Sequence, residues 1–369
     1  MTEPNGLSPF KPVFSSKVPN AAKNGENVEF FVESTKNGSE RATVVIRVHE
    51  DFVWLLHCLK TQDNVTSIIF PPLPAQPTTS LQAAEKKTKK QAGEKAKILV
   101  GDNYDEHCRA YEKFLDLCTQ HPRLGHSNVL QAFAFEKDPP AKVKVKRNFF
   151  EAVTKAVDDI RLANYKDNDE SFQQIRVNNN ENLKNMKEAS NRFQQIVNSE
   201  HRISNLYRDI HDGVKALAAS DENTMKTDSL FQLFGSALEH SSEESNVIAI
   251  NRQRSLGAVL QLYSGFAKSE HEMLQKRVQK MVELENAKKT FEKAKPQKKQ
   301  QAEETMKRLE RELNDMTELA KPELERHNRQ RLLTMQSALV QLADSEIKNA
   351  RDGLAVFTKL YSDVQKVQL

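Results

Sequence analysis

The feature that most constrains the fold is a repeat of apolar residues at every third or fourth position, which runs from about residue 172 almost to the end of the chain. Such spacing places apolar side chains on one face of a helix. The repeat breaks only near Ser220-Asp221 and near Pro296. It predicts three antiparallel helices of roughly 50 to 70 residues each. Helices this long leave apolar surface uncovered, and dimerisation is a natural way to bury it.

Pro322 falls inside the third of these helices. Proline removes one backbone hydrogen bond, and its ring collides with the preceding turn. A helix that continues through a proline is therefore bent and must be held by its neighbours. Two interpretations remain open at this point: Pro322 bends one long helix, or it ends one helix and starts another.

The first 137 residues have a different pattern, which predicts a small α+β domain. Residues 28–32 and 42–48 are rich in strand-forming side chains, and Asn37-Gly38 between them is a hairpin signal. A third, weaker strand is expected over residues 13–18. Asp51 is placed to cap a helix that carries Phe52.

The rest of this domain is predicted to be helical around a proline-rich loop. Pro71-Pro72-Leu73-Pro74 favours an extended segment. A helix over residues 104–120 would bury the apolar positions Cys108, Tyr111, Phe114, Leu115 and Cys118, and a short last helix follows. Pro139-Pro140 marks the boundary before the long helices.

Composition excludes several classes of protein. The 369 residues carry a net charge of only +4, which is too even a balance to predict nucleic-acid binding. Three cysteines cannot form a disulfide framework or a metal site. No apolar signal segment or membrane span is recognisable, so we expect a cytoplasmic protein that reaches membranes peripherally. No catalytic motif is present, so we expect no enzyme, no catalytic residues, no metal and no cofactor.

Two basic segments are candidates for contact with an anionic membrane. In the first, Lys146 and Arg147 lead into an amphipathic stretch with Phe149, Phe150, Val153 and Val157 on one face. Such a stretch suits a membrane interface, because cations attract anionic lipid while aromatic side chains enter the acyl boundary. The alternative is a first core helix that docks on the long helices, and the segment alone does not decide between the two.

The second basic segment lies where the second long helix is expected to turn into the third. Six cations lie there within a dozen residues, with Glu292 as the single anion: Lys288, Lys289, Lys293, Lys295, Lys298 and Lys299. A solvated loop is the ordinary interpretation, yet so many lysines exceed what solubility needs. Each lysine near an anionic leaflet contributes on the order of 1 kcal/mol.

The run Arg47-Val48-His49-Glu50-Asp51-Phe52, followed by Pro71-Pro72-Leu73-Pro74, resembles the phox-homology (PX) domain. With three long helices behind it, the whole chain resembles a sorting nexin of the PX–BAR class, closest to the retromer-linked five/six/thirty-two subgroup. The resemblance implies an α+β PX domain over residues 10–137 and a linker with an amphipathic helix over 138–160. An all-α, three-helix BAR coiled-coil rod would then follow over 161–369.

Two positions depart from the wider family. PX domains that bind phosphatidylinositol 3-phosphate carry two arginines and an aromatic residue here, and the second arginine holds the 3-phosphate. This chain has Arg47, Val48 and His49. Because valine cannot hold a phosphate, we expect a degenerate phosphoinositide pocket.

In the subgroup the PX domain resembles a reader of receptor tails, in which an extended cargo segment adds to a sheet edge. The resemblance implies Phe30, Val100, Tyr104 and Cys108 as candidate cargo-binding residues. Gly101 and Asp102-Asn103 interrupt the helix expected beside them, and the insertion is shorter than in the subgroup.

The function expected from the resemblance is that of an endosomal membrane-coat component. It would dimerise with another PX–BAR sorting nexin, bind curved phosphoinositide membranes and recognise transmembrane receptor tails in retromer-associated endosome-to-Golgi or recycling transport. The implied place is the early endosome and its tubules, and the further implied partners are retromer and dynein–dynactin. An alternative from another class is a cytoskeletal adaptor rod that links vesicles to a microtubule motor complex.

Overall fold

The structure is a computed structural model that describes residues 10–62, 65–78, 104–138, 165–220 and 225–367. The chain forms two compact units. Of the described residues, the first contains those within 10–78, 104–183 and 265–328, and the second contains those within 184–264 and 329–367. Within the described ranges, none of the helices combines the length and the apolar character that a bilayer span requires.

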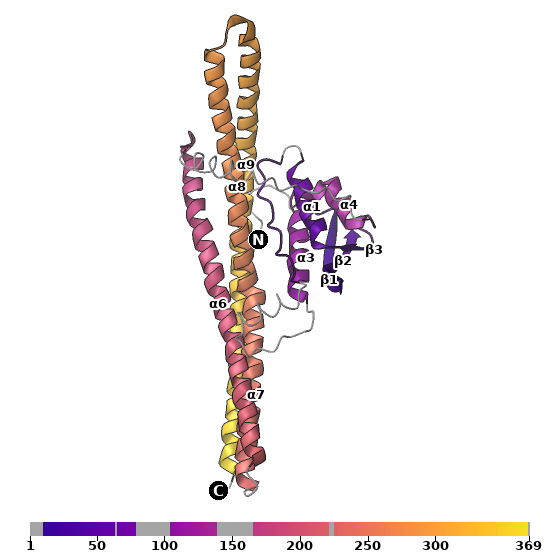
Figure 1. The fold of residues 1–369 in the computed structure, drawn as a ribbon, viewed down its shortest axis with the longest axis vertical. Coiled ribbons are helices and arrows are strands. Elements are labelled where there is room, and N and C mark those ends of the chain that lie inside the picture. The colour runs from indigo at the N-terminus through magenta and orange to yellow at the C-terminus, as the bar shows by residue number, and fades with distance from the viewer. Residues whose placement is uncertain (1–9, 63–64, 79–103, 139–164, 221–224, 368–369) are drawn as a thin grey trace, which may run out of the picture. The chain divides into compact units, whose positions relative to one another are not determined.

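A three-stranded antiparallel sheet in the order β1-β2-β3 opens the first unit (Figure 1). The strands are β1 (Phe14–Asn24), β2 (Asn27–Lys36) and β3 (Ala42–Arg47). Gly38 has a φ of 81°, as the turn predicted at Asn37-Gly38 requires. The first strand is longer than predicted, and its register shifts between Lys17 and Asn20. Pro19 lies in that shift, where its lack of a backbone N–H breaks no regular hydrogen bond of the sheet.

Helices α1 (His49–Lys60), α3 (Asp105–Thr119) and α4 (Asn128–Phe135) and the short η1 (Leu124–His126) complete this small domain. Asp51 stabilises the start of α1 by accepting a 2.8 Å hydrogen bond from the backbone N–H of Val48. The core is aromatic, with the Phe52 ring 4.2 Å from that of Tyr111 and 5.0 Å from that of Phe133 between ring centroids. The predicted α+β architecture is confirmed.

Long helices make up the rest of the described chain: α6 (Glu170–Ser220), α7 (Met225–Arg252), α8 (Ala258–Glu292) and α9 (Pro296–Lys366). A π-helical turn, η2 (Gln253–Gly257), joins α7 to α8, so these two form the second of the three predicted helices. Helix α6 ends at Ser220 and α9 begins at Pro296, close to the two breaks that the sequence predicts.

Pro322 lies within α9, which continues through it without interruption. The interpretation that one helix ends and another starts at this proline is therefore wrong. Whether Pro322 also bends α9 stays a prediction.

Helices α6 and α7 run antiparallel in the second unit, with small residues at their contact. Ser204 Oγ donates a 2.7 Å hydrogen bond to the carbonyl of Ser242, and Ser242 Oγ donates one of 2.8 Å back to the carbonyl of Ser204. Further along, His211 Nδ1 lies 2.8 Å from the carbonyl of Gly235. Such small side chains let the two backbones approach closely, and the hydrogen bonds fix their register.

Candidate functional site

Arg47 supports the fold of the small domain and is not available to a ligand. Its side chain is fully buried. Its guanidinium donates hydrogen bonds to the carbonyls of Ile46, at 2.9 Å, and Phe133, at 3.1 Å, and also to that of Glu136. The last two carbonyls lie at the end of α4, where a cation is favoured. Burial lowers the pKa of Arg47, which Asp51 and Glu136 oppose.

The other two residues of the expected pocket offer no phosphate ligand. Val48 precedes the first turn of α1 and has only methyl groups to present. The ring nitrogen Nδ1 of His49 lies 2.5 Å from the hydroxyl of Tyr111, which is buried in the core. Burial lowers the pKa of His49, with Glu50 opposing, and a neutral imidazole attracts phosphate weakly. The degenerate phosphoinositide pocket stays a prediction.

Replacing Arg47 by alanine is expected to destabilise the small domain by roughly 3 kcal/mol, because several buried carbonyls lose their donor. Thermal unfolding measures this loss. Arg47→Lys is the matched variant. It keeps the charge but loses the planar fork of donors, so the small domain should keep only part of the stability that Arg47 gives it. A lipid-binding defect with unchanged unfolding temperature would contradict the structural role.

Three of the four candidate cargo residues lie in the core. Phe30, Tyr104 and Cys108 are all buried, with exposed fractions of 8% or less. Burial, more than the neighbouring charges, raises the pKa of the Cys108 thiol to about 11. Val100 lies outside the described residues, as does the stretch predicted to be amphipathic, with Lys146, Arg147, Phe149, Phe150, Val153 and Val157. A peptide reaches the three buried side chains only if their neighbours move, so the cargo role stays a prediction.

The predicted lysine cluster lies at the turn between α8 and α9, within the first unit. All six of its lysines are exposed: Lys288, Lys289, Lys293, Lys295, Lys298 and Lys299. Lys289 forms an ion pair of 2.7 Å with Glu285, and the Lys299 ammonium lies 5.5 Å from the centre of the Phe291 ring. We call these six residues the lysine tip. Their exposure and shared sign make the tip a candidate surface for an anionic partner.

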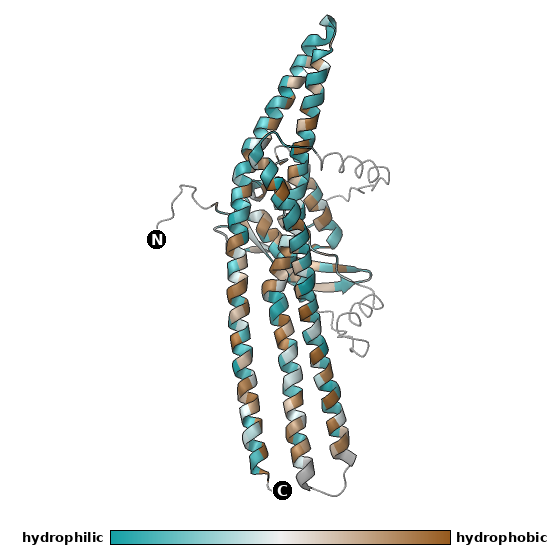
Figure 2. Ribbon diagram, turned by 90° about the vertical axis from the view of Figure 1, so that its left-hand side faces the viewer, coloured by the Kyte–Doolittle hydropathy of each residue, from teal (hydrophilic) through white to brown (hydrophobic). Residues whose placement is uncertain are grey.

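The described structure also contains a surface that the sequence analysis did not separate from the core. Large apolar residues are exposed on two helices of the second unit at intervals of seven. They are Ile196, Ile203, Ile210 and Leu217 on α6, and Leu333, Val340, Ile347, Leu354 and Tyr361 on α9. We call these nine residues the apolar seam. Figure 2 shows hydrophobic turns recurring along the helix that ends near the C-terminus. A strict seven-residue repeat is the signature of helices that pack against another helix in a coiled coil.

The buried side of α9 in the second unit has few large apolar residues, and those of the apolar seam lie on its exposed side. The residues that α9 turns away from solvent in the second unit are mostly small or polar, among them Ala338, Ser345 and Asn349. Arg252 reinforces this orientation, because its guanidinium bonds Glu200 of α6 and Glu346 of α9, each at 2.6 Å. These bonds raise the pKa of Arg252, the one from Glu346 most. The ion triad fixes how α6, α7 and α9 face one another.

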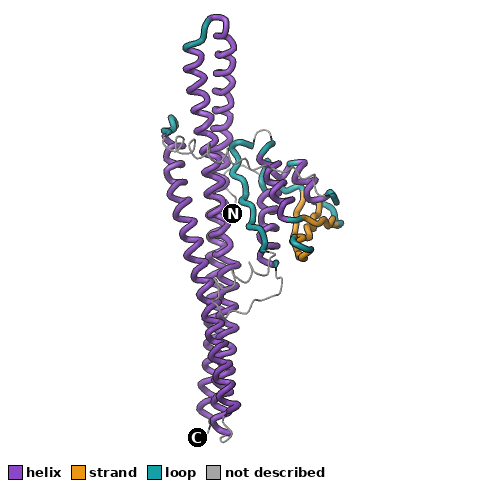
Figure 3. Tube along the Cα trace, viewed as in Figure 1, coloured by secondary structure: helices purple, strands orange, loops and turns teal. Residues whose placement is uncertain are grey.

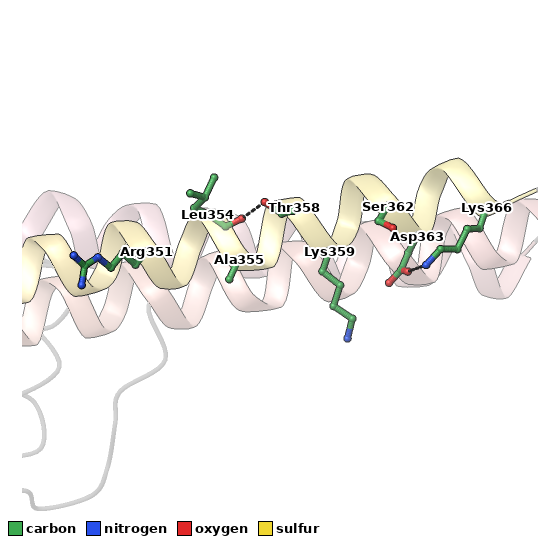
Figure 4. A pocket seen from close by; sticks show the side chains of 8 residues that line it. All are labelled: Arg351, Leu354, Ala355, Thr358, Lys359, Ser362, Asp363 and Lys366. Carbon is green, nitrogen blue, oxygen red and sulfur yellow. Dashed lines mark hydrogen bonds and ion pairs between the residues drawn. The ribbon is translucent and has the colours of Figure 1, made fainter.

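The described residues offer little for chemistry on a small molecule. One surface depression is lined by eight residues of α9 alone, from Arg351 to Lys366, as Figure 4 shows. Leu354 of the apolar seam is one of them. No group of three or more potential metal ligands occurs in the part of the chain that the structure describes.

The chain was compared with protein families, curated proteins and solved structures. A family model described as "PX domain" matches residues 35–136, which contain β3 and the helices of the small domain. "Sorting nexin-6" of Homo sapiens is 23% identical over 359 residues, covering 91% of this chain and 88% of that protein. "Sorting nexin-32" of Mus musculus is 20% identical over 364 residues, with 91% and 89% covered. The solved structure "The cryo-EM structure of the SNX-BAR Mvp1 tetramer" aligns over 94% of this chain and 99% of that chain, at 12% identity and a TM-score of 0.48.

Proposed function

This chain belongs to the PX–BAR sorting nexins, of the kind represented by sorting nexins 6 and 32, and from that membership we propose that it forms one half of a heterodimeric coat on endosomal tubules. Membership makes it a non-enzymatic protein of endosomal trafficking that associates peripherally with membranes. Sorting nexins of this class dimerise with one another and bind phosphoinositide membranes.

The apolar seam carries the proposal. Its side chains are between 39% and 70% exposed, and all of them are large hydrophobic residues. Large apolar side chains exposed repeatedly along two helices are typical of a protein interface. Because the seven-residue repeat matches the spacing of a coiled coil, the occupant that it fits is another long helical rod.

The partner is a sorting nexin that does bind phosphoinositide. In this chain Val48 replaces the phosphate-binding arginine, while Arg47 and His49 are engaged within the fold. The chain alone therefore lacks specific affinity for the 3-phosphate, and its partner supplies it. The lysine tip adds attraction to anionic lipid that is not selective for a headgroup.

Finer features of the function are part of the same proposal. The PX domain selects receptor tails by pairing with an extended segment. The coat works with retromer in endosome-to-Golgi or recycling transport, on early endosomes, and connects to dynein–dynactin. The first of these roles is supported by the order β1-β2-β3, which leaves β1 and β3 with one neighbouring strand each in the described sheet, and family membership supports the others.

The mass of the complex tests the central pairing. We expect the purified chain, mixed with a phosphoinositide-binding PX–BAR sorting nexin, to form a one-to-one dimer in sedimentation equilibrium. A mixture that sediments as two unlinked species would contradict the heterodimer.

A further inference from the structure

Glu323, the residue after Pro322, is an ionised side chain buried inside the first unit. Only 8% of it is exposed. Its carboxylate accepts a 3.0 Å hydrogen bond from the backbone N–H of Ile69 and one of 3.2 Å from Nε2 of His121. Arg326 of the same helix adds a further bond of 2.7 Å. A carboxylate on α9 thus holds two segments of the PX domain that are far from it in sequence.

His121 is held in the one tautomer that can donate to Glu323. Its Nδ1 accepts hydrogen bonds from the backbone N–H groups of Arg123, at 3.1 Å, and Leu124, at 3.2 Å. The proton of the neutral ring must therefore lie on Nε2, which faces Glu323. Burial lowers the pKa of His121, and Arg326 and Arg123 act in the same direction, while Glu323 alone opposes them. His121 consequently stays neutral and acts as a fixed donor.

The proline-rich loop makes the second contact with the long helices. Figure 3 draws this loop, which follows α1 in the chain, in teal. Ser67 Oγ donates a 2.8 Å hydrogen bond to the carbonyl of Met316 on α9. Pro72 lies against Gly265 of α8 so closely that a Cβ added to the glycine would come within 2.5 Å of the proline ring. Ile68, Ile69 and Phe70 between these contacts are buried.

From these contacts we infer that Glu323 and Gly265 form a clamp that holds the PX domain in one orientation on α8 and α9, without lipid, cargo or partner. Glu323 is a positioning residue: it acts through Ile69 and His121, not through any ligand. The inference rests on the proposed function in one respect. Because the lysine tip belongs to the same unit, the clamp would hold whatever the PX domain binds at a set distance from the membrane contact.

The clamp is expected to be insensitive to pH near neutrality. Burial alone would raise the pKa of Glu323, but the bonds from His121 and Arg326 outweigh it and lower the pKa from 4.5 to about 2. A carboxylate with a lowered pKa contributes stability that is complete above its unfolded value of 4.5 and is lost as the pH falls toward 2. Protonation therefore releases the clamp only in strong acid.

Hydrogen–deuterium exchange of the full-length protein, without membranes or partner, tests the clamp. In Glu323→Ala the amides of residues 66–70 should exchange about tenfold faster or more, because buried donors lose a charged acceptor. Peptides from β2 should be unchanged. The matched control is Glu318→Ala, which removes an exposed carboxylate of the same helix that pairs with nearby Lys321. Equal exchange of residues 66–70 in both variants would overturn the inference.

If Glu323→Ala fails to fold, two further variants test the clamp: Gly265→Ala and His121→Asn. Alanine stabilises a helix more than glycine does. If no residue packed against position 265, Gly265→Ala should therefore slow amide exchange in α8. Because Pro72 packs against Gly265, the variant should instead speed exchange of residues 66–70. His121→Asn keeps an acceptor for the backbone N–H groups of Arg123 and Leu124 but cannot reach Glu323. It should also speed exchange of residues 66–70, and unchanged exchange in both variants would overturn the clamp. These outcomes are independent of whether the rod dimerises.

Discussion

Replacing Ile347 and Leu354 together by glutamate is expected to weaken the rod dimer more than a hundredfold. Both side chains belong to the apolar seam and are 51% and 70% exposed in the single chain. Burying each of them in a dimer should contribute about 1.5 to 3 kcal/mol. Losing both costs roughly 3 to 6 kcal/mol, and a buried carboxylate would cost more. Sedimentation of the mixture with the phosphoinositide-binding partner measures the loss.

The matched control is Lys359→Glu. Lys359 is exposed on the same helix, five positions after Leu354, and so lies away from the seam in a seven-residue repeat. The control should leave the dimer intact, and all variants should keep the helical circular dichroism of the parent because the seam is exposed in the single chain. A dimer unaffected by the double substitution would show that the interface lies elsewhere.

Reversing the charge of Lys293, Lys295, Lys298 and Lys299 is expected to reduce binding to anionic vesicles by about a thousandfold or more. All four are exposed at the lysine tip. Each contributes on the order of 1 kcal/mol to attraction by an anionic leaflet, so losing four costs about 4 kcal/mol. Titration of the heterodimer with phosphatidylserine vesicles, at low salt and again at high salt, measures the effect.

Arginine at the same four positions is the control, since it preserves charge at the same places. It should bind as the parent does, and the salt dependence should vanish only in the glutamate variant. Binding that survives the reversal would favour the adaptor alternative, which needs no basic tip.

Local chemistry was sufficient to predict part of the small domain. The Asn37-Gly38 turn and the strand-forming residues 28–32 led to β2 and β3, because their preferences are set within a few residues. The length of β1 was missed, since Pro19 and its polar neighbours read as a loop until β2 supplies their hydrogen bonds. The π-helical turn at Gln253–Gly257 has no apolar signature and was also missed.

Which face of a long helix is buried could not be predicted from one sequence. Ile203 and Ser204 are neighbours on α6, yet the isoleucine is 39% exposed and the serine is buried. Hydropathy alone predicts the reverse. The serine is inside because Ser242 of α7 provides a reciprocal partner, and the isoleucine is outside because its interface is with another molecule in our account. The seven-residue spacing was the signal that could have separated the two sets.

Glu323 shows the same limit for polar residues. A glutamate after a proline in a charged helix reads as a solvated side chain. Its donors come from Ile69 and His121, which are 254 and 202 residues away. Arg47 is a similar case, because the carbonyls it bonds belong to the distant end of α4. Long-range hydrogen bonds of this kind leave no periodicity in the sequence.

Liposome co-sedimentation of the full-length chain tests the central claim most directly. The chain would be measured alone and together with a phosphoinositide-binding PX–BAR sorting nexin, on vesicles with and without phosphatidylinositol 3-phosphate. We predict that it pellets strongly only with the partner and the lipid. Strong, lipid-specific pelleting of the chain alone would contradict the degenerate pocket, and no pelleting in any mixture would contradict the heterodimeric coat.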